Sequence, residues 1–482
     1  MENKLNEEKF VDMGENMKSI ENRFQSKTMC TAKWLQTTLH LQNGFTHSCH
    51  HPKAHKIPTD EIRRSPSALH NTAFKLEQRA KMLNNIRPEE CDYCWNIEDL
   101  PGNNYSDRTY KSIEPEWSMP YLDEIENKGA NSHINPSYLE VSFENTCNFK
   151  CAYCSPDISS KWLEEIKQYG PYPTTWNTGN LEWLKQTGQM PILNREYNPY
   201  VEAFWDWWPN LYPSLHTFRI TGGEPLLSKN TWKVLEYIKK NPKPNLSFAI
   251  NTNLGVPDHL IDKLLRYYSE ISPNIKRFDI YTSAEAWGSQ CEYIRYGMDY
   301  QKFIKNCKKI LSVITNINNG DNRLHFMITF NLLSVTTFVN FLSDIIALRN
   351  EYNQNERLNY VPIMTSYVRW PKFLDVRLLT NDIKQKFKND LLEFSNIWSI
   401  SNFRKMKKDG ATDLNQKVVF YMEEINQFDR LIEYMETEHP NENVERGNFY
   451  KFITEYDKRK NLNFYKTFPE LSNFYDLCKE YK

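Results

Sequence analysis

The chain has 482 residues, enough for two or three domains at roughly 100–200 residues each, which excludes a single small module. Aromatic residues make up 14% of it, and this excludes a disordered polypeptide. The 60 basic and 61 acidic side chains leave a formal charge of -1. Bulk electrostatics therefore give no reason to expect binding to nucleic acid or to an anionic membrane.

The chain shows no signal for a membrane or for secretion. Its apolar runs fall short of the about 20 residues of a spanning helix, and the N-terminal MENKLNEEKF lacks the apolar core of a secretion signal. We therefore expect a cytoplasmic protein, in which cysteines stay reduced. The spacing of the ten cysteines then becomes the informative feature, and they stand at positions 30, 49, 91, 94, 147, 151, 154, 291, 307 and 478.

In chain order, the first 28 residues predict a polar helix or a ragged end, and the alternation after Trp34 predicts a strand and hairpin. A loop to about residue 60, a helix over 71–83 and a second loop over 100–136 are expected next. Short apolar runs then predict six strands, at 139–143, 217–221, 247–251, 277–282, 326–331 and 361–368. Helical stretches separate them, as in parallel βα units, at 232–240, 259–268, 301–315 and 336–349.

This alternation predicts an α/β fold, with a partial or complete βα-barrel over 136–380. A tryptophan-rich insertion at 155–215 interrupts it, and its tryptophans are expected to pack or to form a lid over a substrate. Only helical periodicity follows, which predicts a C-terminal helical extension over 381–482. The cysteine-rich residues 1–130 form a predicted N-terminal module.

Three cysteines, Cys147, Cys151 and Cys154, follow the first of the six predicted strands in a CxxxCxxC spacing. Three thiolates can bind three irons of a 4Fe-4S cube, which leaves the fourth iron open to a small molecule. A zinc site would need a fourth ligand nearby, whereas the next histidine is the distant His216. We therefore expect an iron-sulfur cluster, with zinc or inert buried thiols as the alternatives.

The second of the six strands ends in Thr221-Gly222-Gly223-Glu224-Pro225. Glycines let the backbone approach a ligand closely, and the carboxylate can accept a hydrogen bond from an ammonium group. Together with CxxxCxxC and the tyrosine before its last cysteine, this motif resembles the radical S-adenosylmethionine (radical SAM) superfamily. The resemblance implies a partial (β/α)6 radical SAM barrel. It also implies reductive cleavage of SAM, at the cluster, to a 5'-deoxyadenosyl radical that abstracts hydrogen from a substrate.

The resemblance assigns SAM-binding roles to seven residues: Tyr153, Gly222, Gly223, Glu224, Asn253, Ser283 and Arg295. Glu224 and the two glycines are expected at the SAM amino group, and Tyr153 near the adenine. Asn253 follows the third strand, whose polar residues approach SAM in the family. Ser283 is expected at the ribose, and Arg295, assigned to the next helix, at the SAM carboxylate. A surface ion pair is the alternative for Arg295.

Four further cysteines form a second pattern, Cx13Gx4C followed by CxxC, at Cys30, Cys49, Cys91 and Cys94. It resembles the auxiliary-cluster motif of SPASM and Twitch domains, which flank radical SAM cores and hold additional 4Fe-4S clusters. In the usual order this module follows the barrel, whereas here the cysteines precede it. A zinc ribbon built from the same cysteines with His50, His51 or His55 is the alternative.

The remaining cysteines suggest packing: Cys307 and Cys478 lie on apolar helical stripes, while Cys291 could line the site. The sequence as a whole predicts a radical SAM enzyme with a Twitch-like N-terminal module. Its substrate is expected to be a peptide or protein side chain or a small molecule that it oxidises, with an electron donor such as flavodoxin or ferredoxin. The alternative from another class is a non-catalytic, zinc-binding protein-interaction module.

Overall fold

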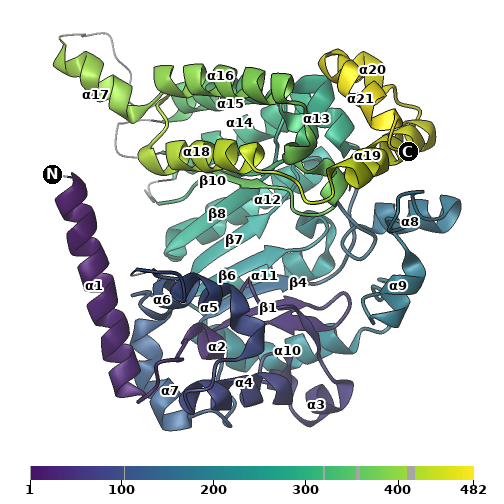
Figure 1. The fold of residues 1–482 in the computed structure, drawn as a ribbon. Coiled ribbons are helices and arrows are strands. Elements are labelled where there is room, and N and C mark those ends of the chain that lie inside the picture. The colour runs from purple at the N-terminus through teal and green to yellow at the C-terminus, as the bar shows by residue number, and fades with distance from the viewer. Residues whose placement is uncertain (1, 103, 318–320, 354–358, 410–417) are drawn as a thin grey trace. The chain divides into compact units, whose positions relative to one another are not determined.

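The computed structural model describes residues 2–102, 104–317, 321–353, 359–409 and 418–482 (Figure 1). The chain divides into two compact units, each discontinuous in sequence. The first comprises 1–145, 185–222 and 245–248, and the second comprises 146–184, 223–244 and 249–482. This division does not test the predicted domain boundaries near 136 and 380, which stay predictions. Strand β7 (Ser247–Asn251) begins in the first unit and ends in the second.

The first unit contains the parallel strands β1 (Gln36–His40), β4 (Tyr138–Ser142) and β6 (Thr217–Thr221), adjacent in this order. Antiparallel pairing extends the sheet from β1 to β2 (Phe45–His47) and β3 (His55–Lys56). The predicted hairpin is thus present. Its first strand also pairs with β4 about one hundred residues later, a partner that a hairpin pattern does not specify.

Helices of the first unit are mostly short: α1 (Glu2–Arg23), α2 (Ala32–Leu35), α3 (Thr59–Arg64), α4 (Ala73–Leu83), α5 (Asp92–Glu98), α6 (Asp107–Ser112), α7 (Leu122–Lys128) and α10 (Pro199–Leu211). The predicted helix over 71–83 is α4. The predicted loops up to residue 60 and over 100–136 are wrong in part, because they contain β3, α6 and α7. Elements of two to seven residues are too short for periodicity to reveal, and α7 forms by burying Leu122 and Ile125.

The second unit contains the end of β7 and the strands β8 (Arg277–Thr282), β10 (Leu324–Phe330) and β11 (Ile363–Tyr367). β10 pairs in parallel with both β8 and β11. The six predicted strands correspond to β4, β6, β7, β8, β10 and β11, with ends shifted by at most two residues. The fold is mixed α/β with a parallel-strand sheet, and closure into a barrel stays a prediction.

Helices of the second unit are longer: α8 (Ser160–Tyr169), α11 (Lys229–Lys240), α12 (Asp258–Ile271), α13 (Gly288–Ile294), α14 (Tyr300–Asn316), α15 (Phe338–Tyr352), α16 (Asn381–Ile397), α17 (Ile400–Lys408), α18 (Met422–Glu436), α19 (Glu442–Lys460), α20 (Phe464–Thr467) and α21 (Ser472–Lys479). A further helix, α9 (Leu181–Gln186), crosses from this unit into the first. Figure 1 shows the C-terminal helices other than α17, green to yellow, grouped with α13, α14 and α15. Apolar stripes drive this packing, as in α18, which buries Phe428, Leu431 and Ile432.

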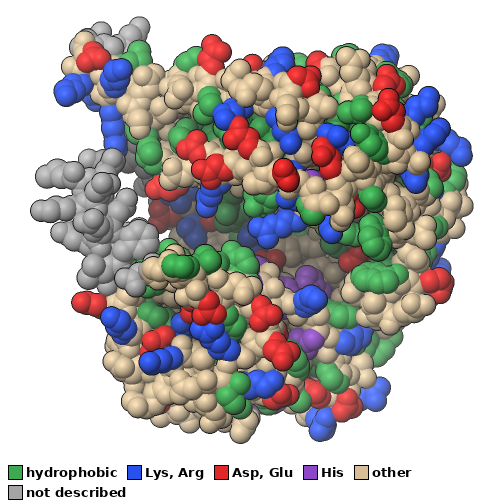
Figure 2. Space-filling model, viewed as in Figure 1, with side chains coloured by type: hydrophobic (Ala, Val, Ile, Leu, Met, Phe, Trp, Pro, Cys, Tyr) green, Lys and Arg blue, Asp and Glu red, His purple; other side chains and the backbone are tan. Residues whose placement is uncertain are grey.

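Burial separates the tryptophans of the insertion. Trp162, Trp207 and Trp208 are buried and serve packing, whereas Trp176 and Trp183 are exposed. Cys291, Cys307 and Cys478 are all buried. Figure 2 shows basic and acidic side chains interspersed on the visible face, in keeping with the net charge of -1. Within the described ranges, each helix is too short or too polar to cross a membrane.

Candidate active site

The three cysteines of the CxxxCxxC motif lie on residues 146–154 of the second unit, here called the cluster loop. A short strand in this loop, β5 (Lys150–Cys151), pairs antiparallel with β9 (Arg295–Tyr296), which sets Cys151 opposite Arg295. The indole of Trp162 in α8 donates to Cys151 O at 2.9 Å. Cys147, Cys151 and Cys154 are all partly exposed. The backbone of the loop is therefore fixed while its thiols stay accessible.

The three thiols lie close enough for their charges to interact. Burial raises the pKa of Cys147 to about 11 and that of Cys151 to about 12. The pKa of Cys154 is also raised, first by burial and then by the charges of the other two thiolates. Phe149 N donates to Cys147 Sγ at 3.4 Å. Bound iron would supply the positive charge that deprotonated thiols need, and backbone N–H groups at the sulfurs are typical of iron-sulfur sites, so this donor set fits a cluster.

Glu224 is a buried carboxylate, 2% exposed, that follows the glycine pair. Its Oε1 accepts hydrogen bonds from Thr252 Oγ1 at 2.8 Å and Leu226 N at 3.0 Å, and its Oε2 accepts from Asn253 N at 2.7 Å. All three donors are neutral, and burial raises the pKa of Glu224 to about 7. A carboxylate offers about four acceptor sites. The donors of the described chain therefore leave room for one more, and an ammonium group would add the missing positive charge.

Hydrogen bonds connect Glu224 and Asn253 to the cluster loop. Glu224 N donates to Thr146 O at 2.7 Å, and Asn253 Nδ2 donates to Asn148 Oδ1 at 2.8 Å. Asn148 Nδ2 in turn donates to Gly255 O at 3.0 Å. The structure thus brings the predicted residues Glu224 and Asn253 together with the cluster loop. Asn148, one residue after the first cysteine, carries much of this connection, and sequence reasoning missed it.

Gly222 belongs to the first unit and has a φ of +116°, a conformation that residues with a Cβ rarely adopt. A Cβ at this position would lie 2.5 Å from Ser142 Oγ and 3.2 Å from Glu144 O. Both the backbone conformation and the close approach of Ser142 therefore require glycine. Gly223, the next residue, is partly exposed.

Arg295 lies in β9, directly after α13, and not inside the helix to which the sequence assigned it. Its guanidinium forms a buried ion pair with Glu285, with Nη2 2.6 Å and Nε 2.9 Å from Oε2. The two side chains are 6% and 0% exposed, so the alternative of a surface ion pair is wrong. Tyr153 Oη donates to both Glu285 oxygens at 3.3 Å, and Arg295 lies 5.6 Å from the centre of the Tyr153 ring.

Glu285 is therefore a functional candidate that sequence reasoning missed. The available signal was a carboxylate two residues after Ser283, in the segment that follows β8. Ser283 itself comes directly after the last residue of β8 and is partly exposed. Cys291 is buried in α13, and its thiol pKa is raised by burial and then by the charge of Glu285. Its thiol thus lies near the Glu285–Arg295 pair.

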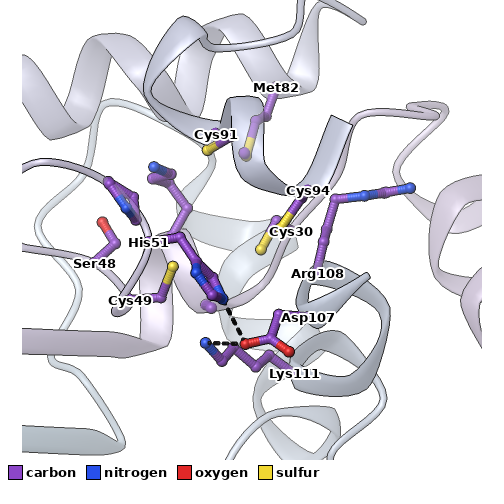
Figure 3. Close-up of a pocket in the computed structure, with 13 residues that line it drawn as sticks. Cys30, Ser48, Cys49, His51, Met82, Cys91, Cys94, Asp107, Arg108 and Lys111 are labelled. Atoms are coloured by element: carbon purple, nitrogen blue, oxygen red, sulfur yellow. Dashed lines mark hydrogen bonds and ion pairs between the residues drawn. The ribbon is translucent and has the colours of Figure 1, made fainter. Parts of the chain in front are cut away.

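The four N-terminal cysteines line one pocket of the first unit, here called the auxiliary site (Cys30, Cys49, Cys91 and Cys94; Figure 3). They come from the turn before α2, the segment after β2, a short 3-10 helix and α5. Cys49 is partly exposed and the other three are buried. The fold therefore brings the two halves of the predicted pattern to one place.

Cationic side chains line the same pocket, at Lys33, Arg108 and Lys111. Lys33 is 2% exposed and pairs with Glu90 outside the pocket lining. Burial raises the pKa of Cys30 to about 11, and the charges of Lys33 and Arg108 oppose this rise. Such neighbours favour an anionic centre, and a set of four thiolates with bound metal is one.

Two histidines of the zinc alternative, His51 and His55, lie within hydrogen-bond distance of other side chains. His51 lines the pocket, but its Nε2 lies 2.7 Å from Asp107 Oδ2 (Figure 3). Its ring stacks on Tyr93. His55 Nε2 lies 2.9 Å from Thr72 Oγ1. Across the part of the chain that the structure describes, no three Cys, His, Asp or Glu side chains converge on a site for one metal ion. A 4Fe-4S cluster differs from a single ion, because each of its thiolates binds a different iron.

Residues 141–331 match the family described as the Radical SAM superfamily. One curated relative, GTP 3',8-cyclase of Desulforamulus reducens, is 30% identical over 112 residues, which are 23% of this chain and 25% of the cyclase. The match thus spans a quarter of that relative. Crystal structures of Streptococcus suis SuiB bound to S-adenosylmethionine and to precursor peptide SuiA are both 13% identical to this chain. They cover 71% and 70% of this chain and 75% and 73% of SuiB, with TM-scores of 0.28 and 0.26.

Proposed function

We propose that this protein, whose residues 141–331 match the radical SAM superfamily, binds a 4Fe-4S cluster through Cys147, Cys151 and Cys154 and cleaves S-adenosylmethionine reductively. When bound, these groups supply a 5'-deoxyadenosyl radical that abstracts hydrogen from a substrate. The observation that carries the proposal is the hydrogen-bond network that joins the cluster loop to the buried carboxylate of Glu224. Three thiols and one carboxylate are the groups that a cluster and an amino-acid ligand require.

Glu224 is proposed to bind the SAM ammonium through its remaining acceptor site. The carboxylate is ionised above its pKa of about 7, so its attraction for a cation is greatest in neutral to alkaline solution. Thr252, Leu226 and Asn253 hold both of its oxygens in place. Gly222 contributes only backbone, because a side chain there would strike Ser142.

The Glu285–Arg295 pair is proposed to position Tyr153, the residue directly before Cys154, because the Tyr153 hydroxyl donates to Glu285. This modifies the role expected for Arg295, since a SAM carboxylate would have to share the guanidinium with Glu285. The buried pair still places a cation beside the cluster loop, opposite Cys151. Ser283 keeps its proposed role at the ribose.

The auxiliary site is proposed to bind a second 4Fe-4S cluster, as in the Twitch-like module that its cysteine spacing resembles. Four thiols in one pocket and its three cationic neighbours support this. The proposed substrate is a peptide side chain or a small molecule, which the enzyme modifies as an oxidoreductase. An electron donor such as flavodoxin or ferredoxin is the proposed partner that reduces the first cluster.

The test is anaerobic reconstitution followed by iron analysis and incubation with SAM and dithionite. We expect a brown protein with about eight irons per chain and formation of 5'-deoxyadenosine. A colourless protein with stoichiometric zinc and no 5'-deoxyadenosine would refute the proposal and favour the zinc-binding interaction module. Mass spectrometry of candidate peptides after turnover would then identify the substrate class.

A further inference from the structure

The C-terminal helix α19 reaches the cluster loop through a buried tyrosine. Tyr456 is 0% exposed, and its hydroxyl lies 3.2 Å from Lys150 O and 3.0 Å from Tyr293 O, the two carbonyls to which it donates. Lys150 directly precedes Cys151, and Tyr293 lies in α13 two residues before Arg295. One hydroxyl therefore connects the first residue of β5 to the end of α13, the helix that leads directly into β9.

A lysine one turn later on the same helix makes a second connection. Lys460 Nζ donates to both oxygens of Glu165 at 2.8 Å and to Tyr172 Oη at 2.9 Å. Glu165, in α8, also accepts from Lys150 Nζ at 2.6 Å. The side chains of Lys460 and Glu165 are 0% and 2% exposed. Glu165 therefore joins α19 to the cluster loop through a buried carboxylate between two ammonium groups.

Both connections are of a kind that restrains the loop. The Tyr456 hydroxyl donates hydrogen bonds to two backbone carbonyls, one in the loop and one in α13. Loss of the Tyr456 hydroxyl would leave two carbonyls without this donor. Loss of Lys460 or Glu165 would deprive a buried charge of a counter-charge. The indole of Trp162 also donates a hydrogen bond to Cys151 O, so side chains of both α8 and α19 restrain the backbone of the loop.

We propose that α19 clamps the cluster loop, with Tyr456 and Lys460 as positioning residues that determine how Cys151 is presented to iron. This inference rests on the proposed cluster at the three cysteines. It gives a role to the C-terminal region, where the sequence showed no chemistry. The two residues act through their hydrogen bonds to Lys150, Tyr293 and Glu165.

The first test uses the protein without metal, so that it does not depend on the cluster. Tyr456→Phe removes the hydroxyl that donates to Lys150 O and Tyr293 O. The matched control is Tyr268→Phe, because Tyr268 is equally buried and its hydroxyl donates to Phe278 O at 2.9 Å, in β8. We expect amide hydrogen exchange in the cluster loop to be at least about tenfold faster in Tyr456→Phe than in the control.

The second test uses reconstituted protein that carries alanine at both Cys91 and Cys94, so that the auxiliary site does not contribute. In this background Tyr456→Phe should lose iron to a chelator about tenfold faster and change the electron paramagnetic resonance spectrum of the reduced cluster. Tyr268→Phe should do neither. If Tyr456→Phe fails to fold by circular dichroism, Lys460→Met, similar in size, takes its place with the same expectations.

Equal loop exchange in Tyr456→Phe and Tyr268→Phe, or an unchanged spectrum and iron-release rate, would overturn the clamp. A protein that binds no iron at the three cysteines would instead refute the proposed function, and the exchange experiment would still report on the clamp. The two failures are therefore distinguishable.

Discussion

Replacing Glu224 with glutamine tests the proposed SAM contact, because the change removes a charge and almost no volume. In the native site the carboxylate accepts hydrogen bonds at both oxygens, from Thr252, Leu226 and Asn253. A glutamine amide has one acceptor oxygen, so its NH2 group must face either Asn253 N–H or Leu226 N–H. We therefore expect Glu224→Gln to lose both the charge and one buried hydrogen bond.

The size of the effect follows from the loss of one charged hydrogen bond to the SAM ammonium, about 1.5–3 kcal/mol. At about 1.4 kcal/mol for each factor of ten, the Kd for SAM should rise about 10- to 150-fold. Iron content should stay unchanged, because no cysteine is altered. The backbone N–H that faces the glutamine NH2 group loses its acceptor, and this should lower the free energy of unfolding by about 1–3 kcal/mol.

The pH dependence provides a second readout of the same carboxylate. Its pKa of about 7 lies above the ordinary value of 4.5, so protonation is favoured in the folded protein. Its contribution to stability is therefore full below pH 4.5 and is lost as the pH rises through about 7. SAM binding has the opposite sign, because it favours the ionised form. Below pH 7 the Kd of the wild type should rise by up to about tenfold per pH unit, and that of Glu224→Gln should stay flat.

Anaerobic calorimetry at pH 6, 7 and 8 would measure these constants. Glu236→Gln is a suitable control, since Glu236 is a partly exposed glutamate of α11 that pairs with Lys240 in the same unit. It should bind SAM with the affinity and pH dependence of the wild type. If Glu224→Gln did so too, the carboxylate would serve only to order Thr252, Leu226 and Asn253, and the reasoning would be refuted.

Three further predictions concern the cysteines and the buried ion pair. Replacing all three cysteines of the cluster loop with alanine should remove about four irons per chain and abolish 5'-deoxyadenosine, measured by iron assay and chromatography; residual 5'-deoxyadenosine would contradict the assignment. Replacing Cys91 and Cys94 with alanine should remove about half of the iron and abolish product formation, while SAM is still cleaved. A normal product yield would mean that the auxiliary site is only structural. Glu285→Gln should lower the free energy of unfolding of the metal-free protein by about 3–5 kcal/mol, measured by denaturant titration, because it leaves Arg295 buried without its counter-charge. Adding Arg295→Met should recover part of this loss, and strictly additive losses would argue against the pair.

Local patterns in the sequence were enough to find the cysteine motif and to locate the strands. Cys147, Cys151 and Cys154 lie within eight residues, so local chain geometry suffices to bring them together. The six strands are found within two residues of their predicted ends, because short apolar runs between helical stretches are local information. The SAM-binding roles of the individual residues stay predictions.

Which side chains meet one another became clear from the folded chain alone. Arg295 finds Glu285 because β9 pairs with β5, and Tyr456 reaches Lys150 across 306 positions of sequence because α19 packs against the cluster loop. Residue type shows that a buried charge or hydroxyl needs a partner, but not which one. That choice depends on how helices and strands distant in sequence pack together, and periodicity within a single segment carries no record of it.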